Sequence, residues 1–339
     1  MTGCIHCGIH IPLYNKGYLY VKSDKELNPF DQMEIPYQRG YYQLSYTSSE
    51  ALAERMESWT ARSDFSAILA GLSQTSDQPH PDRLIPFGEL LNRLKNKKVI
   101  DFIQTGNMVA HLQPIINLQN MQLYGYESLL RSGSKDENYS PMEIFRTANE
   151  TGLHSLLDQR AREAAIKTRK EKVPADLKSF INFLPSTIYN PEFCLKHTFK
   201  IVDAYGVDPA NLVFEVVETE NIVDVPHLKN VLDTYKREGM KVALDDVGSG
   251  FATVEMLKKL QPDYVKVDRS YISFCDQDEQ KQQFLHEVLS ISNGLGITML
   301  AEGMERQEEM QYCQSIGIPL AQGYYIGKPS PEALVPNLI

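Results

Sequence analysis

Short apolar runs of five to seven residues recur through the C-terminal part of the chain, and their β-branched and aromatic content is typical of strands. The eight runs are Ala110–Ile116, Leu123–Glu127, Ser179–Phe183, Leu212–Val217, Lys241–Asp246, Tyr264–Asp268, Thr298–Glu302 and Leu320–Tyr325. From the second run onward, amphipathic stretches separate them, for example Val225–Glu238, Thr253–Leu260 and Glu279–Leu295. Alternating strands and helices predict a parallel sheet, and eight such units predict a barrel.

The connection between the first two runs departs from this pattern. Only the six residues Asn117–Gln122 join them. A crossover between parallel strands needs a dozen or more residues. We therefore expect the first strand to be antiparallel to the second, in an α/β fold that is a modified TIM (β/α)₈ barrel.

A small α+β unit is predicted ahead of the barrel. Gly17–Lys22 and Tyr41–Tyr46 have the composition of strands, and Ser48–Ser63 has the pattern of an amphipathic helix that Ser48 or Ser49 would cap. A second amphipathic stretch, Phe87–Ile103, would lead into the larger domain.

Between these parts lies Ser73–Arg83, a polar segment with two prolines that we interpret as a linker. This gives two domains. Residues 1–80 form a small N-terminal module, for which we hypothesise a regulatory or dimer-forming role, and residues 81–339 form the barrel.

Composition narrows the class of protein. The chain has 339 residues, a net charge of −10 and five cysteines. The charge disfavours binding to long nucleic acid, which depends on Lys and Arg. With a mean hydropathy of −0.33, we find no apolar run long enough to span a membrane and no signal peptide. The odd, sparse cysteines suit a reducing, cytoplasmic setting.

Two of these cysteines, in Cys4-Ile-His-Cys7, have the spacing of half a zinc site. The other half is missing nearby, and Cys194, Cys275 and Cys313 form no second pair with such spacing. A Zn²⁺ ion completed by His10 or by a distant residue is one interpretation, and free thiols are the other.

The runs in the barrel domain end in polar residues, at the ends of strands where barrel enzymes carry their active sites. These residues are Glu127, Asn182, Glu215, Glu218, Asp245, Asp246, Lys266, Asp268, Glu302 and Gln322. Each alone could be a helix cap, a polar turn or, for the lysine, an ion-pair partner. Together, so many buried oxygens at one mouth would repel one another unless a cation neutralised them.

The oxygen-only donor set favours Mg²⁺ or Mn²⁺ and disfavours zinc, since no cysteine or histidine converges with it. Four carboxylates are enough for two ions about 3.5–4 Å apart, which stabilise the attacking and leaving oxygens in a displacement at phosphorus. The predicted chemistry is phosphodiester hydrolysis. Lys266 could orient the attacking water, and Glu302 could complete the second ion site or take a proton from that water.

Several of these polar residues belong to short motifs. The most specific of them is Glu127-Ser-Leu-Leu-Arg131. Seven further motifs are Leu112-Gln-Pro-Ile115, Ile181-Asn-Phe-Leu-Pro185, Phe214-Glu-Val-Val-Glu218, Asp245-Asp-Val-Gly-Ser-Gly250, Lys266-Val-Asp-Arg269, Ala301-Glu-Gly-Met-Glu305 and Ala321-Gln-Gly-Tyr324. In their order, over roughly Phe87–Pro331, these motifs resemble those of EAL-domain cyclic di-GMP phosphodiesterases, whose signature is E-x-L-L-R.

The resemblance implies hydrolysis of cyclic di-GMP to linear pGpG, with two metal ions per barrel and a homodimer. It assigns one ion to Glu127, Asn182, Glu215 and Asp245, and the second to Asp246 and Glu302 with Asp245 bridging. Lys266 would position the water, and Glu218 would brace the loop Val247–Thr253. The residues implied in substrate binding are Gln113, Leu129, Arg131, Asp268 and Gln322, and Arg131 suits a phosphate because its guanidinium can bind two oxygens.

The departures from the family pattern are few. Ser128 replaces an alanine, Leu184 a serine, and Val247 the phenylalanine of the Asp-Asp loop; His111 stands where an aromatic residue is common. The matched metal and lysine positions are all kept. The alternative to an active enzyme is a weak or inactive cyclic di-GMP receptor or protein-interaction barrel. A different metallohydrolase is disfavoured by the motif order.

Overall fold

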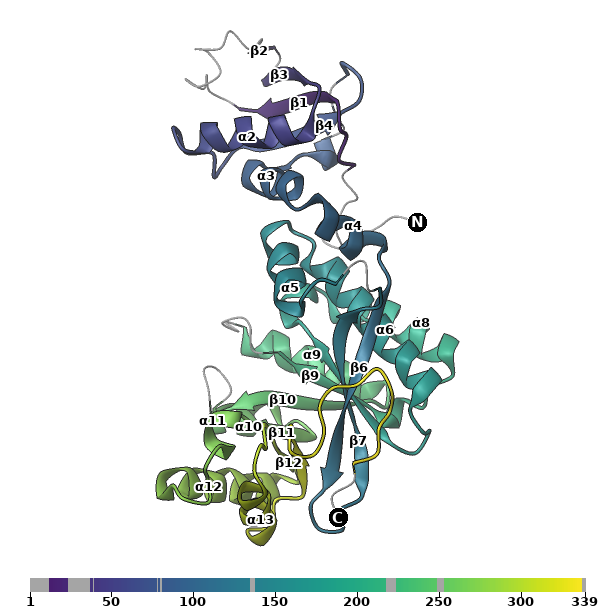
Figure 1. Ribbon diagram of the computed structural model, residues 1–339, viewed down its shortest axis with the longest axis vertical. Coiled ribbons are helices and arrows are strands. Elements are labelled where there is room, and N and C mark those ends of the chain that lie inside the picture. Colours follow the sequence, from purple (N-terminus) through teal and green to yellow (C-terminus); the bar gives the residue numbers. More distant parts are fainter. Residues whose placement is uncertain are drawn as a thin grey trace. The chain divides into compact units, whose positions relative to one another are not determined.

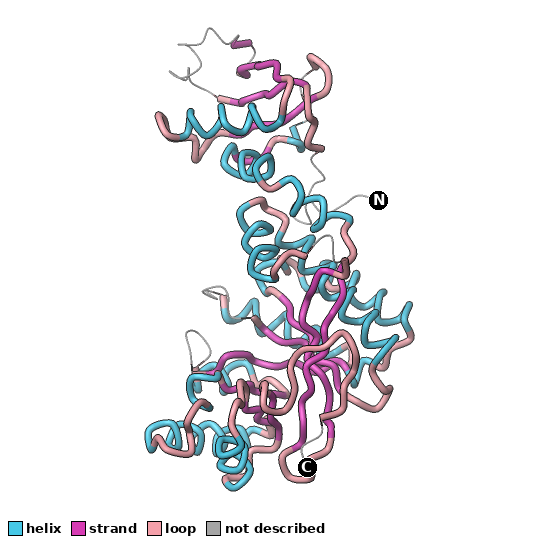
Figure 2. The backbone as a smooth tube through the Cα atoms, in the orientation of Figure 1, coloured by secondary structure: helices cyan, strands magenta, loops and turns pink. Residues whose placement is uncertain are grey.

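The computed structural model describes residues 12–23, 37–38, 40–77, 79, 81–134, 138–217, 224–248 and 253–336. The chain forms two compact units (Figures 1 and 2). Unit 1 comprises Met1–Asn107 and Ser134–Leu157, and unit 2 comprises Met108–Gly133 and Asp158–Ile339. No helix in the described part of the chain is both long and apolar enough to cross a membrane.

Unit 1 contains an antiparallel sheet of five strands in the order β2-β3-β1-β4-β5. Their bounds are β1 Gly17–Lys22, β2 Tyr37–Gln38, β3 Tyr41–Tyr46, β4 Leu69–Ser73 and β5 Ile85–Pro86. Both strands predicted from the sequence, β1 and β3, are present. The segment that we interpreted as a linker joins β4 to β5, by way of the 3₁₀ helix Pro81–Arg83, so this sheet continues past residue 80.

The helices of unit 1 pack on this sheet and on one another (Figure 1). Their bounds are α2 Ser49–Thr60, α3 Phe87–Lys95, α4 Lys97–Thr105 and α5 Pro141–Glu150. α2 begins after Ser48, whose hydroxyl accepts a hydrogen bond from the Ala51 N–H at 3.2 Å. Phe87 of α3 shares a buried core with Trp59 of α2. The single predicted stretch Phe87–Ile103 is two helices, because the backbone leaves the helical conformation at Asn96.

Unit 2 is a closed barrel in the order β10-β11-β12-β13-β6-β7-β8-β9. Its strands are β6 Met108–Asn117, β7 Leu123–Ser132, β8 Lys178–Phe183, β9 Leu212–Val216, β10 Lys241–Val247, β11 Tyr264–Val267, β12 Thr298–Ala301 and β13 Leu320–Gln322. β6 is antiparallel to both neighbours, β7 and β13, and the remaining neighbours are parallel. This confirms the modified TIM barrel with an antiparallel first strand.

Helices lie outside these strands (Figure 2). They are α7 Pro191–Cys194, α8 Lys196–Tyr205, α9 Val225–Arg237, α10 Val254–Leu260, α11 Arg269–Ile272, α12 Glu279–Leu295 and α13 Gln307–Ser315. Two 3₁₀ helices, Pro185–Thr187 and Pro209–Asn211, precede α7 and β9. The chain passes from one unit to the other three times, and the last of these boundaries falls within α6, His154–Lys172.

A layer of apolar side chains fills the barrel interior, as is usual for this architecture. Seven strands each supply one buried residue to it: Ile115, Phe180, Val213, Ala243, Tyr264, Leu300 and Leu320. Tyr124 of β7 packs against the layer, and its hydroxyl lies 2.6 Å from that of Tyr264. Because side chains alternate along a strand, the next inward position on each strand lies two residues away from this layer.

Candidate active site

Seven of the predicted site residues occupy those next inward positions. Two residues after the apolar layer come Asn182, Glu215, Asp245, Lys266, Glu302 and Gln322. On β6, which runs in the opposite direction, Gln113 comes two residues before Ile115. The alternation of the strands thus places these polar side chains together at the C-terminal mouth of the barrel.

Lys266 lies at the centre of this group and is only 1% exposed. Its Nζ is 2.5 Å from Glu302 Oε1, 3.1 Å from Glu215 Oε1, 3.2 Å from Asp245 Oδ1 and 3.8 Å from Glu127 Oε2. Burial lowers the pKa of Lys266, but the surrounding carboxylates outweigh it and raise the pKa well above its ordinary value. The lysine is therefore a fixed positive charge.

Glu127, on β7, is held by two amide groups. Its Oε1 accepts a hydrogen bond from Asn182 Nδ2 at 2.9 Å, and its Oε2 accepts one from Gln322 Nε2 at 2.7 Å. Burial raises the pKa of Glu127, yet Lys266 and these two donors together hold it below the ordinary value. Glu127 is accordingly the carboxylate of this site most strongly held in its ionised form.

The other carboxyl groups have too little positive charge around them. Burial, reinforced by neighbouring carboxylates, raises the pKa of Glu215 and Glu302 well above the ordinary value despite the lysine, and burial also raises that of Asp245. Glu215 is fully buried, and neither of its carboxylate oxygens accepts a hydrogen bond within the described structure. A buried carboxylate in this condition is costly unless a further cation binds it.

Asp245 and Asp246 are neighbours at the end of β10, where strict alternation would point them to opposite faces. Asp246 has φ +54°, and the pairing of β10 with β11 shifts register between Leu244 and Val247. This local turn brings ligand atoms of Asp245, Asp246 and Glu302 within 4.8 Å of one another. The donors are all oxygens, as Mg²⁺ and Mn²⁺ prefer, so the residues present fit the predicted metal ions.

A pocket of about 250 Å³ opens beside these carboxylates. Of the predicted residues, Gln113, Glu127, Asp268, Glu302 and Gln322 line it. Leu129 and Arg131, both on β7, do not; the guanidinium of Arg131 donates a hydrogen bond to the carbonyl of Leu130 at 2.7 Å. These two residues therefore lie outside the pocket lining, although Arg131 is near enough to Glu127 to help lower the pKa of that carboxyl.

Several lining residues had not been singled out from the sequence: Arg269, Gly303, Glu305, Gly323 and Tyr324. They fall within the motifs quoted above, directly beside residues that were selected, so the motifs were the available signal. Arg269 and Glu305 form an ion pair at 2.9 Å. Gly303 has φ +70°, and a Cβ atom there would lie 2.5 Å from the Arg269 side chain.

Three predictions fall on parts of the chain that lie outside the described residues. They concern Glu218, most of the loop Val247–Thr253, and the Cys4 and Cys7 pair. The structure bears on none of them.

Comparison with known proteins agrees with the barrel and its motifs. The sequence profile described as "EAL domain" matches residues 96–329. "Probable cyclic di-GMP phosphodiesterase PdeG" of Escherichia coli (strain K12) is 32% identical over 233 residues, which are 67% of this chain and 45% of that protein. "Cyclic di-GMP phosphodiesterase PdeF" of the same organism is 28% identical over 246 residues, 71% of this chain and 32% of that protein. The chain spans less than half the length of these two relatives.

Solved structures of EAL proteins are also similar to this chain. A standalone versatile EAL protein from Vibrio cholerae O395, in a c-di-GMP bound form, is 31% identical with a TM-score of 0.62, over 69% of this chain and 97% of that one. Klebsiella pneumoniae BlrP1, as a calcium/cy-diGMP complex, is 20% identical with a TM-score of 0.60, over 93% of this chain and 96% of that one, and shows the fold alone. The family profile covers more than half of the chain and agrees with the barrel's antiparallel first strand and carboxylate-lined mouth: the chain belongs to the EAL domain family.

Proposed function

We propose that this chain is a metal-dependent phosphodiesterase that hydrolyses cyclic di-GMP to linear pGpG. The observation that carries the proposal is the ring of four carboxylates around buried Lys266, next to a pocket of about 250 Å³. The names of the relatives and the ligand of the V. cholerae structure support the choice of substrate.

Two Mg²⁺ or Mn²⁺ ions would be held by the oxygen donors at the mouth. Glu127, Asn182, Glu215 and Asp245 would bind one ion, and Asp246 and Glu302 the other, with Asp245 shared. Such ions supply positive charge where the attacking and leaving oxygens become negative. The buried carboxylate of Glu215, which accepts no hydrogen bond within the described structure and pairs with Lys266 at 3.1 Å, is the feature of the chain that this assignment explains best.

The remaining groups bind and orient the substrate and move protons. Lys266 is buried among four carboxylates, which position its ammonium group at the mouth. When metal ions take over part of the neutralisation of these carboxylates, an N–H of the ammonium group would be free to donate a hydrogen bond to a water molecule and hold it for attack on phosphorus. Glu302, whose Oε1 lies 2.5 Å from Lys266 Nζ and whose side chain lines the pocket, would take the proton from that water in its ionised form. Gln113, Asp268 and Gln322 would bind the substrate from the pocket wall. Leu129 and Arg131 would extend this binding surface beyond the pocket, and Glu218 would brace the Asp-Asp loop.

Chromatography of the full chain incubated with cyclic di-GMP, in Mg²⁺, in Mn²⁺ or in a chelator, tests this proposal. We expect pGpG to accumulate only with metal. Glu215→Gln should abolish turnover and remove most of the rise in melting temperature that metal gives the parent protein. The matched control is Glu255→Gln, since Glu255 is exposed and pairs only with its helix neighbour Lys259 among the described ion pairs. Metal-independent turnover, or full activity of Glu215→Gln, would contradict the assignment.

Tight binding of cyclic di-GMP without any product would instead favour a receptor. Val247 is the feature that motivates this second possibility. It is fully buried on β10 and pairs with Val267, but it lacks the aromatic ring that the family carries in this loop.

We also propose that the protein is a homodimer in a reducing, cytoplasmic setting and that its N-terminal module, residues 1–80, regulates the barrel, residues 81–339. The cysteines Cys194, Cys275 and Cys313 are free thiols, which supports a reducing setting. Light scattering of the full chain tests the dimer, and a monomeric mass at micromolar concentration would contradict it.

A further inference from the structure

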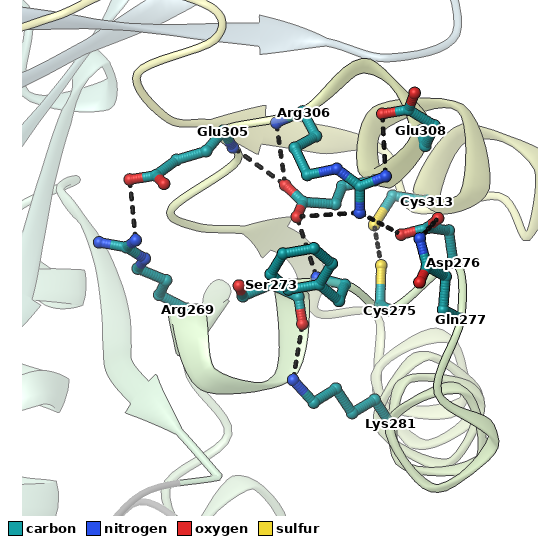
Figure 3. A network of polar contacts seen from close by, with 12 residues as sticks. Arg269, Ser273, Cys275, Asp276, Gln277, Lys281, Glu305, Arg306, Glu308 and Cys313 are labelled. Carbon is teal, nitrogen blue, oxygen red and sulfur yellow. Dashed lines mark hydrogen bonds and ion pairs between the residues drawn. The ribbon is translucent and has the colours of Figure 1, made fainter.

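Two buried cysteines, one in a helix connection and one on a helix of the barrel, meet behind the wall of the pocket. Cys275 lies in the connection between α11 and α12, and Cys313 lies on α13. Their sulfur atoms are 4.0 Å apart and point toward each other (Figure 3), although 37 residues separate them in the chain. Both are fully buried. A disulfide requires a separation of about 2.05 Å, so a relative movement of the two segments by about 2 Å would suffice.

We propose that Cys275 and Cys313 are a modification site, at which a peroxide converts the two thiols into a reversible disulfide that lowers turnover in the neighbouring pocket. The effect on turnover rests on the proposed function; the modification does not.

The chemistry is balanced by one molecule of hydrogen peroxide. The Cys275 thiolate attacks a peroxide oxygen, the O–O bond breaks, and the departing hydroxide takes a proton to become water. The sulfur of Cys313 then attacks the sulfenic acid on Cys275, and its proton leaves with the hydroxyl group as a second water. Two thiols are oxidised and the peroxide is reduced to two waters. The hydrogen bond from Cys313 lowers the pKa of Cys275 and so favours Cys275 as the attacking thiolate.

The segment that covers Cys275 is strained and partly open to solvent. Phe274 has φ +57°, a left-handed conformation that is unfavourable for a residue other than glycine, and the residue is 53% exposed. Arg306 lies over its ring, 4.7 Å from the centroid, and Glu309 Oε1 accepts a hydrogen bond from its N–H at 2.9 Å. When these two contacts break, the segment can open and admit a molecule as small as hydrogen peroxide.

The same contacts connect the thiol pair to the pocket. Glu309, one helical turn before Cys313 and 1% exposed, also accepts hydrogen bonds from the N–H groups of Glu305 and Arg306, both at 3.0 Å. Glu305 pairs across the pocket wall with Arg269, at the start of α11 (Figure 3). Drawing Cys275 and Cys313 together therefore moves both segments that carry this wall, the one after β11 and the one after β12.

The test uses the full chain with Cys4→Ser and Cys7→Ser, so that Cys194, Cys275 and Cys313 are its remaining cysteines. After treatment with hydrogen peroxide, free thiols are alkylated and peptides are mapped by mass spectrometry. We expect a crosslinked Cys275–Cys313 peptide with the loss of two hydrogen atoms, a several-fold loss of cyclic di-GMP turnover, and recovery of both with dithiothreitol. Cys194→Ser, which removes the third buried thiol, is the matched control and should respond like the parent.

The variants Cys275→Ser and Cys313→Ser should form no crosslink and should keep their turnover in peroxide. If circular dichroism shows that a serine variant is unfolded, the corresponding alanine variant, Cys275→Ala or Cys313→Ala, replaces it. If both thiols stay free while the protein is exposed to peroxide, the proposed modification site is overturned. A crosslink that leaves turnover unchanged would overturn its effect on the pocket. If the reduced protein hydrolyses nothing, the proposed function fails, and the peptide map still decides whether the modification site exists.

Discussion

At the scale of single residues, the unusual group is a buried lysine with more carboxylates around it than it can neutralise. Lys266 faces Glu127, Glu215, Asp245 and Glu302, all within 3.8 Å of its Nζ. Without the lysine, these carboxylates would face one another in a site of low dielectric constant, where an unpaired charge is very costly. The lysine therefore stabilises the mouth of the barrel as well as serving the proposed chemistry.

We predict that Lys266→Met lowers the free energy of unfolding of the barrel by about 3–5 kcal/mol in chelator, since it leaves buried carboxylates without their partner. Divalent cations should restore part of this loss but no turnover. Urea unfolding followed by circular dichroism, with and without Mg²⁺, measures the effect.

Lys259→Met is the matched control for this variant. Lys259 is half exposed and pairs with Glu255 one turn earlier on α10, so its removal should change stability by less than about 0.5 kcal/mol. Equal losses in the two variants would show that the carboxylates around Lys266 do not depend on its charge.

At the scale of elements, the start of α13 fixes the segment that carries Glu302. Glu309, in the first turn of this helix, accepts hydrogen bonds from the N–H groups of Phe274, Glu305 and Arg306. These donors belong to two segments that the chain places far apart, so one carboxylate joins the connection after α11 to the connection after β12.

We predict that Glu309→Ala lowers the free energy of unfolding by about 3 kcal/mol or more, because three backbone donors lose their acceptor. Turnover should fall as well, since Glu302 and Glu305 precede this turn. Glu309→Gln, which keeps an acceptor oxygen, should lose less of both.

Glu308→Gln is the control for the Glu309 variants, because Glu308 is exposed and pairs only with Arg306 among the described ion pairs. Thermal unfolding and initial rates of hydrolysis measure both effects. A Glu309→Ala variant as stable as Glu308→Gln would refute this role of α13.

At the scale of the whole molecule, the described residues of unit 1 and of unit 2 bury their apolar side chains in separate cores. The core of unit 1 contains Trp59, which is the single tryptophan of the chain and is 1% exposed. The candidate metal ligands all belong to unit 2. Tryptophan fluorescence therefore reports on the unit that does not bind the proposed ions.

We predict that Mg²⁺ raises the midpoint of the barrel's unfolding transition and leaves that of Trp59 fluorescence unchanged. At a concentration of one hundred times the dissociation constant, a single bound ion stabilises the barrel by about 2.7 kcal/mol. Denaturant titrations followed in parallel by circular dichroism and by fluorescence test this. An equal shift of both probes would mean that the two units unfold as one.

Much of the barrel and of the site could be predicted from the sequence because the relevant patterns are local. On β8, the alternation of side chains places the polar Asn182 on the same face as the buried Phe180, two residues earlier. On β11 it places Lys266 on the same face as Tyr264. The six-residue connection Asn117–Gln122 is too short for a crossover, which was enough to predict that β6 and β7 are antiparallel. Strand ends that carry carboxylates likewise gave the candidate donor residues.

Only the tertiary structure decided two features of the site. One is the set of contacts between residues far apart in the sequence, and the other is a backbone turn that departs from the alternation of a regular strand. The four carboxylates around Lys266 and the Cys275–Cys313 pair arise from barrel closure and helix packing, and neither has a period in the sequence. The positive φ of Asp246 turns its carboxylate toward that of Asp245, although alternation would separate them. Local patterns determine which face of a strand a side chain occupies; closure of the barrel determines which side chains meet, because that depends on register and packing between elements.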